Sequence, residues 1–186
     1  MWNYRDKFLE NTYYLISNKG FNNNILFENS DDYKTFILYI VSNILDHSGI
    51  SISAYSILPN SFYFVIKNQE EGLKLSDFMR KIQVSYAMYF KKKNENILSS
   101  KWLPVFNWRF KSYKIDLEEL EKIESCVAFE PLRLALVENI KNRPYTSVHQ
   151  SLDTGYDYQS QMYLKIYSEI SQIQKIFFKE DFLAKF

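Results

Sequence analysis

The sequence has 186 residues, of which 46% are hydrophobic and 18% aromatic, and its formal net charge is +1. Its length suits one domain with an appendage, and only four glycines and four prolines argue against a disordered chain. The single cysteine excludes an internal disulfide and a Cys-rich zinc site, and a net charge near zero means that any nucleic-acid binding requires a local basic patch.

Hydrophobic periodicity predicts six main elements in the order strand, helix, two strands, helix, strand. Their expected bounds are 12–17 (strand), 31–47 (helix), 50–58 and 62–67 (strands), 73–92 (helix) and 108–113 (strand). Asn29 to Asp32 provide N-cap residues for the first helix, and the dipeptide Pro59-Asn60 is a turn signal between the two central strands. A third helix is expected at 117–128 and a short fourth at 131–139.

This order is the split βαβ arrangement of a ferredoxin-like α+β domain, with an antiparallel sheet and helices on one face. After residue 151 the pattern changes to a single apolar stripe, which predicts a C-terminal helical extension over residues 151–186. The stripe consists of Tyr163, Ile166, Tyr167, Ile170, Ile173, Phe177 and Phe178. It suits packing on the domain's own core, a homodimer, or another protein partner through residues 156–178.

The N-terminus is polar and has no signal-peptide core. No apolar run approaches the roughly 18 residues that a membrane-spanning helix needs. We therefore expect a soluble cytoplasmic protein with no membrane association.

The segment from Tyr55 to Ile66 resembles the signature strand of the single-tyrosine HUH transposases, especially the REP-associated tyrosine transposases. That strand reads roughly Tyr-Cys-Leu-Met-Pro-Asn-His-x-His-Leu-Leu-Ile in the family, and the Pro59-Asn60 turn with its apolar flanks is kept here. Four other segments are similar to family motifs in the same order, at residues 14–20, 85–90, 106–112 and 129–137. The resemblance covers residues 12–148 and implies an HUH-type domain over residues 1–150.

In that family, two histidines of the central strand hold a divalent metal, and a helical tyrosine attacks phosphorus. A polar side chain one helical turn after the tyrosine completes the metal shell. The resemblance puts the two histidine positions at Ser61 and Tyr63, the nucleophile at Cys126 and the third ligand at Glu130. Because hydroxyl groups are poor ligands for a hard cation, we expect no catalysis, metal or cofactor. The plain alternative is that all four are ordinary packing or surface residues.

Family members bind a folded single-stranded hairpin through basic and polar residues, which gives this chain a set of candidate contacts. They are Asn18, Lys19, Asn22, Asn23, Lys91, Lys92, Lys93, Lys101, Arg109, Lys111 and Arg133. Cations suit phosphates, and the nearby Trp102, Phe106 and Trp108 suit base stacking. A solvated helix end beside a buried aromatic cluster explains the same pattern.

Three functions remain open on the sequence. The first is a catalytically inactive, transposase-derived protein that binds hairpin or single-stranded DNA or RNA without cleaving it. The second is a protein-interaction subunit of a larger assembly that has lost nucleic-acid binding. The third is a divergent metal-dependent nuclease that uses Tyr86 or Tyr89 together with Glu130.

Overall fold

Residues 8–46, 49–70, 74–95, 103–136 and 145–147 are described by the computed structural model. Its four strands form one antiparallel sheet in the spatial order β2-β3-β1-β4. The strands are β1 (Thr12–Lys19), β2 (Ile50–Leu58), β3 (Ser61–Asn68) and β4 (Lys111–Ile115). Because β3 lies between β1 and β2, the predicted split βαβ arrangement and the ferredoxin-like α+β class are confirmed.

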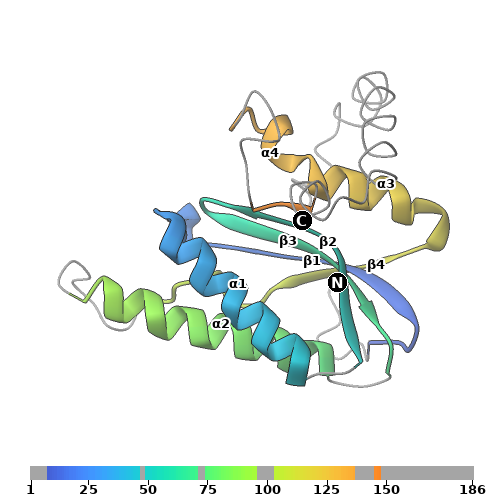
Figure 1. Ribbon diagram of the computed structural model, residues 1–186, viewed down its shortest axis with the longest axis horizontal. Coiled ribbons are helices and arrows are strands. Elements are labelled where there is room, and N and C mark those ends of the chain that lie inside the picture. Colours follow the sequence, from blue (N-terminus) through green and yellow to red (C-terminus); the bar gives the residue numbers. More distant parts are fainter. Residues whose placement is uncertain (1–7, 47–48, 71–73, 96–102, 137–144, 148–186) are drawn as a thin grey trace.

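The helices are divided between the two faces of the sheet (Figure 1). The helices of the split βαβ unit, α1 (Ser30–Asp46) and α2 (Lys74–Lys93), lie together on one face, as expected. On the opposite face lie α3 (Leu117–Ala128) and the short α4 (Glu130–Arg133), so the expectation of helices on one face is incomplete. The physical reason is that Ile123 and Val127 of α3 pack on sheet residues such as Leu15, which strand alternation turns away from α1 and α2.

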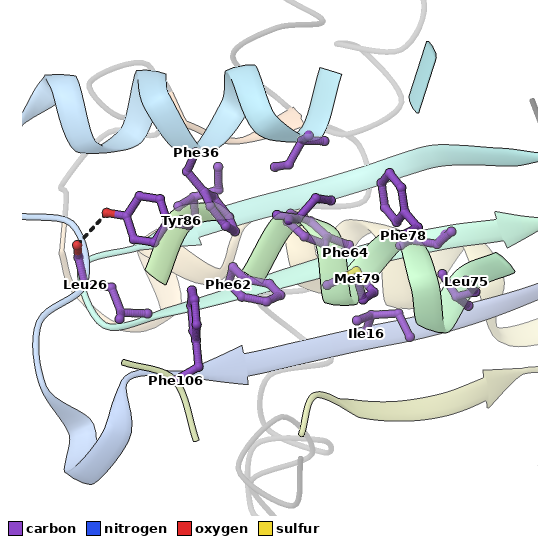
Figure 2. Close-up of a cluster of buried hydrophobic side chains, with 14 of the residues drawn as sticks. Ile16, Leu26, Phe36, Phe62, Phe64, Leu75, Phe78, Met79, Tyr86 and Phe106 are labelled. Carbon is purple, nitrogen blue, oxygen red and sulfur yellow. Dashed lines mark hydrogen bonds between the residues drawn. The ribbon is translucent and has the colours of Figure 1, made fainter. Parts of the chain in front are cut away.

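The main core lies between the sheet and the pair α1–α2, and it is strongly aromatic (Figure 2). Phe62 and Phe64 alternate along β3 and stack with ring centroids 4.8 Å apart, and Phe36 of α1 contacts both rings. Tyr86 of α2 lies fully buried among these rings and donates a hydrogen bond of 2.7 Å to the carbonyl oxygen of Leu26. The many phenylalanines and tyrosines of the sequence therefore fill this side of the sheet.

The start of α1 is capped as the sequence predicted. The side-chain oxygen of Asn29 accepts hydrogen bonds from the backbone N–H groups of Asp31 and Asp32, at 3.1 and 3.2 Å. In return, Asp32 Oδ2 accepts from the N–H groups of Glu28 and Asn29, which completes a reciprocal cap. The fully buried Asp32 carboxylate also receives Lys93 Nζ from the end of α2, at 2.8 and 2.9 Å. This ion pair joins the first turn of α1 to the last turn of α2.

Two predicted elements differ from the structure by more than two residues at a boundary. The fourth strand starts at Lys111 instead of residue 108, because backbone groups of residues 105–107 bond to residues 18–21. The fourth helix is shorter than predicted, at Glu130–Arg133, and its expected continuation over 137–139 lies outside the described residues. The predicted extension over 151–186 also lies outside them. Within the described part of the chain, no helix combines the length and the apolarity that crossing a bilayer requires.

Candidate functional site

Strand register gathers polar side chains on the α3 face of the sheet, at the end where β3 begins. Tyr63 packs beside the apolar cluster under α3, and Ser17 of β1 lies directly opposite it. Ser17 in turn pairs with Lys111 of β4, and two residues further along β1 Lys19 pairs with Ser61. Directly paired residues share a face of the sheet, and so do residues i and i+2 of one strand. The α3 face therefore carries the side chains of Ser17, Lys19, Ser61, Tyr63 and Lys111.

The turn from α3 into α4 adds a second set of groups over this face. Glu130 is fully buried, and its carboxylate is held by the Arg133 guanidinium in a bidentate ion pair, with Nε–Oε2 and Nη2–Oε1 distances of 2.7 and 2.6 Å. Arg133 is one turn along the same short helix, so the pair is local in sequence. Cys126 lies one turn earlier on α3 and is partly exposed.

Electrostatic coupling shows that the residues expected at a metal and nucleophile site do come together. Burial raises the pKa of the Tyr63 hydroxyl, and the Glu130 carboxylate raises it further, against smaller opposing effects of Arg133 and Ser61. Burial is also the main cause of a raised pKa at Cys126, and Glu130 again adds to it. Tyr63 therefore remains a neutral phenol, and Cys126 remains a thiol, at neutral pH. Tyr63 and Cys126 therefore both lie near the Glu130 carboxylate, and Ser61 lies beside Tyr63.

These residues do not fit a divalent-metal site. Only Glu130 offers a carboxylate, and Arg133 already neutralises it with two charge-assisted hydrogen bonds. Ser61 and Tyr63 offer neutral hydroxyls where Mg²⁺ or Mn²⁺ would require anionic or carbonyl oxygens or imidazoles. Across the described residues, no cluster of three or more His, Cys, Asp or Glu side chains is placed to hold a metal ion.

Tyr86 and Tyr89, which the nuclease hypothesis pairs with Glu130, are on the wrong side of the sheet. Both belong to α2, whereas Glu130 belongs to α4 on the opposite face. Tyr86 is fully buried with its hydroxyl bound to Leu26, and burial raises its pKa strongly. The Tyr89 hydroxyl donates to Asp32 Oδ1 at 2.8 Å. These tyrosines bind structural partners and do not lie near Glu130. The combination of Tyr86 or Tyr89 with Glu130 in one active site is therefore incorrect.

The predicted basic and polar contacts separate into structural and exposed groups. Asn18 is buried, and its side chain donates to the Asn107 carbonyl oxygen at 3.0 Å and accepts from the N–H of Lys19. Lys93 is held by Asp32 and Glu28, and Arg133 is held by Glu130. Lys91 is half-buried, and Lys101 lies outside the described residues. The exposed candidates are Lys19, Asn22, Asn23, Lys92, Arg109 and Lys111.

Three of these cations come from segments that the fold places side by side. Lys19 ends β1, Lys111 begins β4 beside Ser17, and Arg109 lies two residues before Lys111. We name Lys19, Arg109 and Lys111 the basic edge. The acidic residues at the start of α3 follow the end of β4 that is opposite to Lys111. They are Asp116, Glu118, Glu119 and Glu121.

The sequence did not predict the residues that surround Tyr63 in the sheet. Ser17 and Ser56 flank Tyr63 across the sheet, and Thr146 pairs with Ser56 through an isolated bridge. The alternation of polar residues at Ser17 and Lys19 was a visible signal for a polar face on β1. The i, i+3 spacing of Glu130 and Arg133 was a signal for their ion pair. Nothing in the local sequence marks Thr146, because its position depends on a tertiary contact.

Comparison with known proteins supports the fold. No protein-family model matches the chain, and no curated protein matches it. Among solved structures it is similar to a REP-associated tyrosine transposase bound to a REP hairpin, with 17% identity and a TM-score of 0.64 over 83% of this chain and 87% of that chain. A putative transposase from Deinococcus radiodurans gives a weaker likeness, with 12% identity, a TM-score of 0.44 and coverage of 66% and 90%. The described chain therefore has the fold of a REP-associated tyrosine transposase.

Proposed function

We propose that this protein is a catalytically inactive, transposase-derived nucleic-acid-binding protein, which recognises hairpin or single-stranded nucleic acid without cleaving it. The observation that carries the proposal is the state of Glu130. It is the only anionic oxygen ligand among the four family positions, and it is buried in a bidentate ion pair with Arg133.

The chemistry of the other three positions supports the absence of cleavage. Phosphodiester attack needs an activated nucleophile, and raised pKa values keep both Tyr63 and Cys126 protonated. Among the described residues no histidine accompanies either group, since both histidines, at positions 47 and 149, lie outside them. A protonated thiol and a neutral phenol beside a neutralised carboxylate do not provide a nucleophile or a Lewis acid.

The binding half of the proposal rests on the basic edge. Its cations lie at one end of the sheet, on or next to the face that carries Ser61 and Tyr63, and the acidic residues of α3 start at the other end. Dispersed lysines and arginines beside exposed asparagines are the groups that contact phosphates and sugars. The structural neighbour bound to a REP hairpin supports a ligand of the same kind for this fold.

The test is fluorescence anisotropy with labelled hairpin, single-stranded and duplex oligonucleotides across a salt series. We expect the affinity for hairpin or single strands to fall steeply with salt, because phosphate contacts release counterions. A variant with both Lys19→Ala and Lys111→Ala is expected to flatten the slope of log K against log[salt] by about 1.4, from roughly 0.7 per lost contact on a single strand. Lys34→Ala on α1 is the matched control, because Lys34 is exposed on the helix layer of the opposite face.

No salt-sensitive binding of any oligonucleotide would overturn this half of the proposal and favour the protein-interaction function. One observation favours that second function. Large apolar side chains are exposed on the outer helices, at Leu38 and Val41 of α1 and at Val84 and Met88 of α2. Stoichiometric association with another polypeptide, weakened by Leu38→Ser and Met88→Ser, would establish it.

The division of the chain is also part of the proposal. We place the transposase-like domain at residues 1–150 and a helical extension at 151–186, with residues 156–178 offered to a second copy or another protein. Sedimentation of the full chain and of a chain ending at residue 150 tests the extension. A dimer that persists without residues 151–186 would contradict it.

A further inference from the structure

Trp108 is the most exposed large hydrophobic side chain that the structure describes, at 86% of its full accessibility. Its neighbours at the alternate positions behave differently, since Phe106 is buried in the main core and Phe110 packs against that core and stacks on Phe8. Tryptophan is usually well buried, and exposed tryptophan is typical of recognition surfaces. Trp108 thus lies outside the core although Phe106 and Phe110, on either side of it, are packed in or against the core.

The segment before Trp108 is fixed to the end of β1 and the residues after it by three hydrogen bonds, two of which form the Gly20–Phe106 bridge. The N–H of Asn107 donates to the Lys19 carbonyl oxygen at 2.8 Å, and the Asn107 carbonyl oxygen accepts from Asn18 Nδ2 at 3.0 Å. The N–H of Phe21 donates to the Val105 carbonyl oxygen at 2.9 Å, and Gly20 forms a bridge with Phe106. These contacts fix the backbone that carries the indole, which lowers the entropy lost when a ligand binds.

The same contacts place the backbone of Trp108 beside the segments that carry the basic edge. Asn107 is bonded to Lys19, Arg109 follows Trp108 directly, and Lys111 starts the strand that this loop leads into. A flat aromatic face bordered by dispersed cations matches a nucleotide, because the ring stacks on the base while lysine and arginine meet the phosphates. An apolar protein groove would not need these cations.

We propose that Trp108 is a stacking platform for one unpaired nucleobase, with Lys19 and Lys111 on the phosphates that flank it. The inference rests on the proposed function and narrows the class of ligand to nucleic acid with an unpaired base. A base inside a duplex is already stacked on both faces, so the platform selects a single-stranded segment or the unpaired nucleotides of a hairpin. DNA and RNA share this chemistry.

The experiment measures anisotropy for labelled oligo-dT and oligo-U, each intact and with several consecutive abasic positions. Full-length wild type is compared with Trp108→Ala, with Trp108→Phe, and with Met88→Ala, an exposed apolar control on α2 at 68% accessibility. We expect Trp108→Ala to weaken binding of the intact strand about tenfold, the size of one lost base–aromatic stack. Trp108→Phe should recover most of the affinity, and Met88→Ala should match wild type.

The abasic strands separate stacking from a general effect of the substitution. Wild type should lose affinity for them, whereas Trp108→Ala should bind intact and abasic strands equally. Affinity that is unchanged in Trp108→Ala, or that falls by the same factor for intact and abasic strands, would overturn the platform and leave the proposed function standing. Wild type that binds neither oligo-dT nor oligo-U nor hairpins would overturn both. The stronger of the two intact strands identifies DNA or RNA as the source of the base.

Discussion

The Glu130 carboxylate is buried where water cannot stabilise it, and the Arg133 guanidinium supplies the compensating charge. Both carboxylate oxygens are occupied by guanidinium N–H groups in the fork geometry that suits this pair. The Glu130 carboxylate thus already binds an internal cation through both of its oxygens. This ion pair leaves Glu130 a poor ligand for a metal ion.

Glu130→Gln tests the importance of that ion pair. We expect the free energy of unfolding to fall by about 2–3 kcal/mol, at or below the low end of the range for breaking a buried pair, because Arg133 is partly exposed and regains water. Urea denaturation measures the change, and Glu118→Gln, on the exposed first turn of α3, is the control with an expected effect below about 0.5 kcal/mol. Equal effects of the two substitutions would show that the ion pair stabilises nothing.

Asp32 gives a prediction about pH. Burial opposes its ionisation, but hydrogen bonds from Lys93, from the N–H of Glu28 and from Tyr89 outweigh burial and lower its pKa below the ordinary 3.8. As pH falls, the unfolded chain therefore binds this proton first, and the stability from Asp32 is full above about pH 5 and lost below the folded pKa. We expect the stability difference between wild type and Asp32→Asn to shrink between about pH 5 and pH 2. A constant difference in denaturation series would contradict the network.

Single residues also show how far sequence reasoning reached. The turn dipeptide Pro59-Asn60 fixes the register of β2 and β3, and with it the places of Ser61 and Tyr63, so those positions were predictable. The structural role of Lys93 was not predictable, because its carboxylate partner, Asp32, is 61 residues away in the chain and meets it only when α1 packs on α2. Asn18 was misleading for the same reason, since a polar residue at a strand end is indistinguishable from a surface contact until residue 107 bonds to it.

At the scale of elements, the loop before β4 is shaped by its contacts with the segment after β1. Predicted strand alternation at residues 108–110 was wrong, since residues 105–107 bond to residues 18–21 and Trp108 projects into solvent. The bounds of the three long helices, α1, α2 and α3, were predicted within one residue because long amphipathic periods and cap residues are local signals. The placement of α3 on the second face was not predicted. Periodicity shows that a helix has an apolar side, but it does not show which surface that side packs on.

Gly20 provides the prediction for this region. A Cβ at Gly20 would lie 2.1 Å from the backbone carbonyl oxygen of Asn24, and the following turn cannot move without breaking its bonds to the loop before β4. Gly20→Ala is therefore expected to destabilise the fold by about 2–3 kcal/mol. Gly49→Ala is the matched control, because its Cβ would meet only the flexible side chain of Glu70, at 2.9 Å. Thermal unfolding compares the two, and an equal, small effect at both glycines would contradict the tight contact.

At the scale of the whole molecule, the two faces of the sheet carry different kinds of residue. The α1–α2 face holds the aromatic core and uses Tyr86, Asp32 and Lys93 for structure. The α3 face holds a smaller apolar cluster and, beyond it, the polar site and the basic edge. We infer that this second face retains a surface for nucleic acid and lacks the chemistry to cut it.

The most direct test combines binding and cleavage in one sample. The full chain is mixed with an end-labelled hairpin that has single-stranded flanks, in Mg²⁺ or Mn²⁺, at a concentration where anisotropy shows saturation. The same sample is then run on a denaturing gel. We expect a saturable anisotropy increase that salt reverses, with the oligonucleotide intact and no label joined to protein. A metal-dependent covalent adduct or a cleaved strand would contradict the claim.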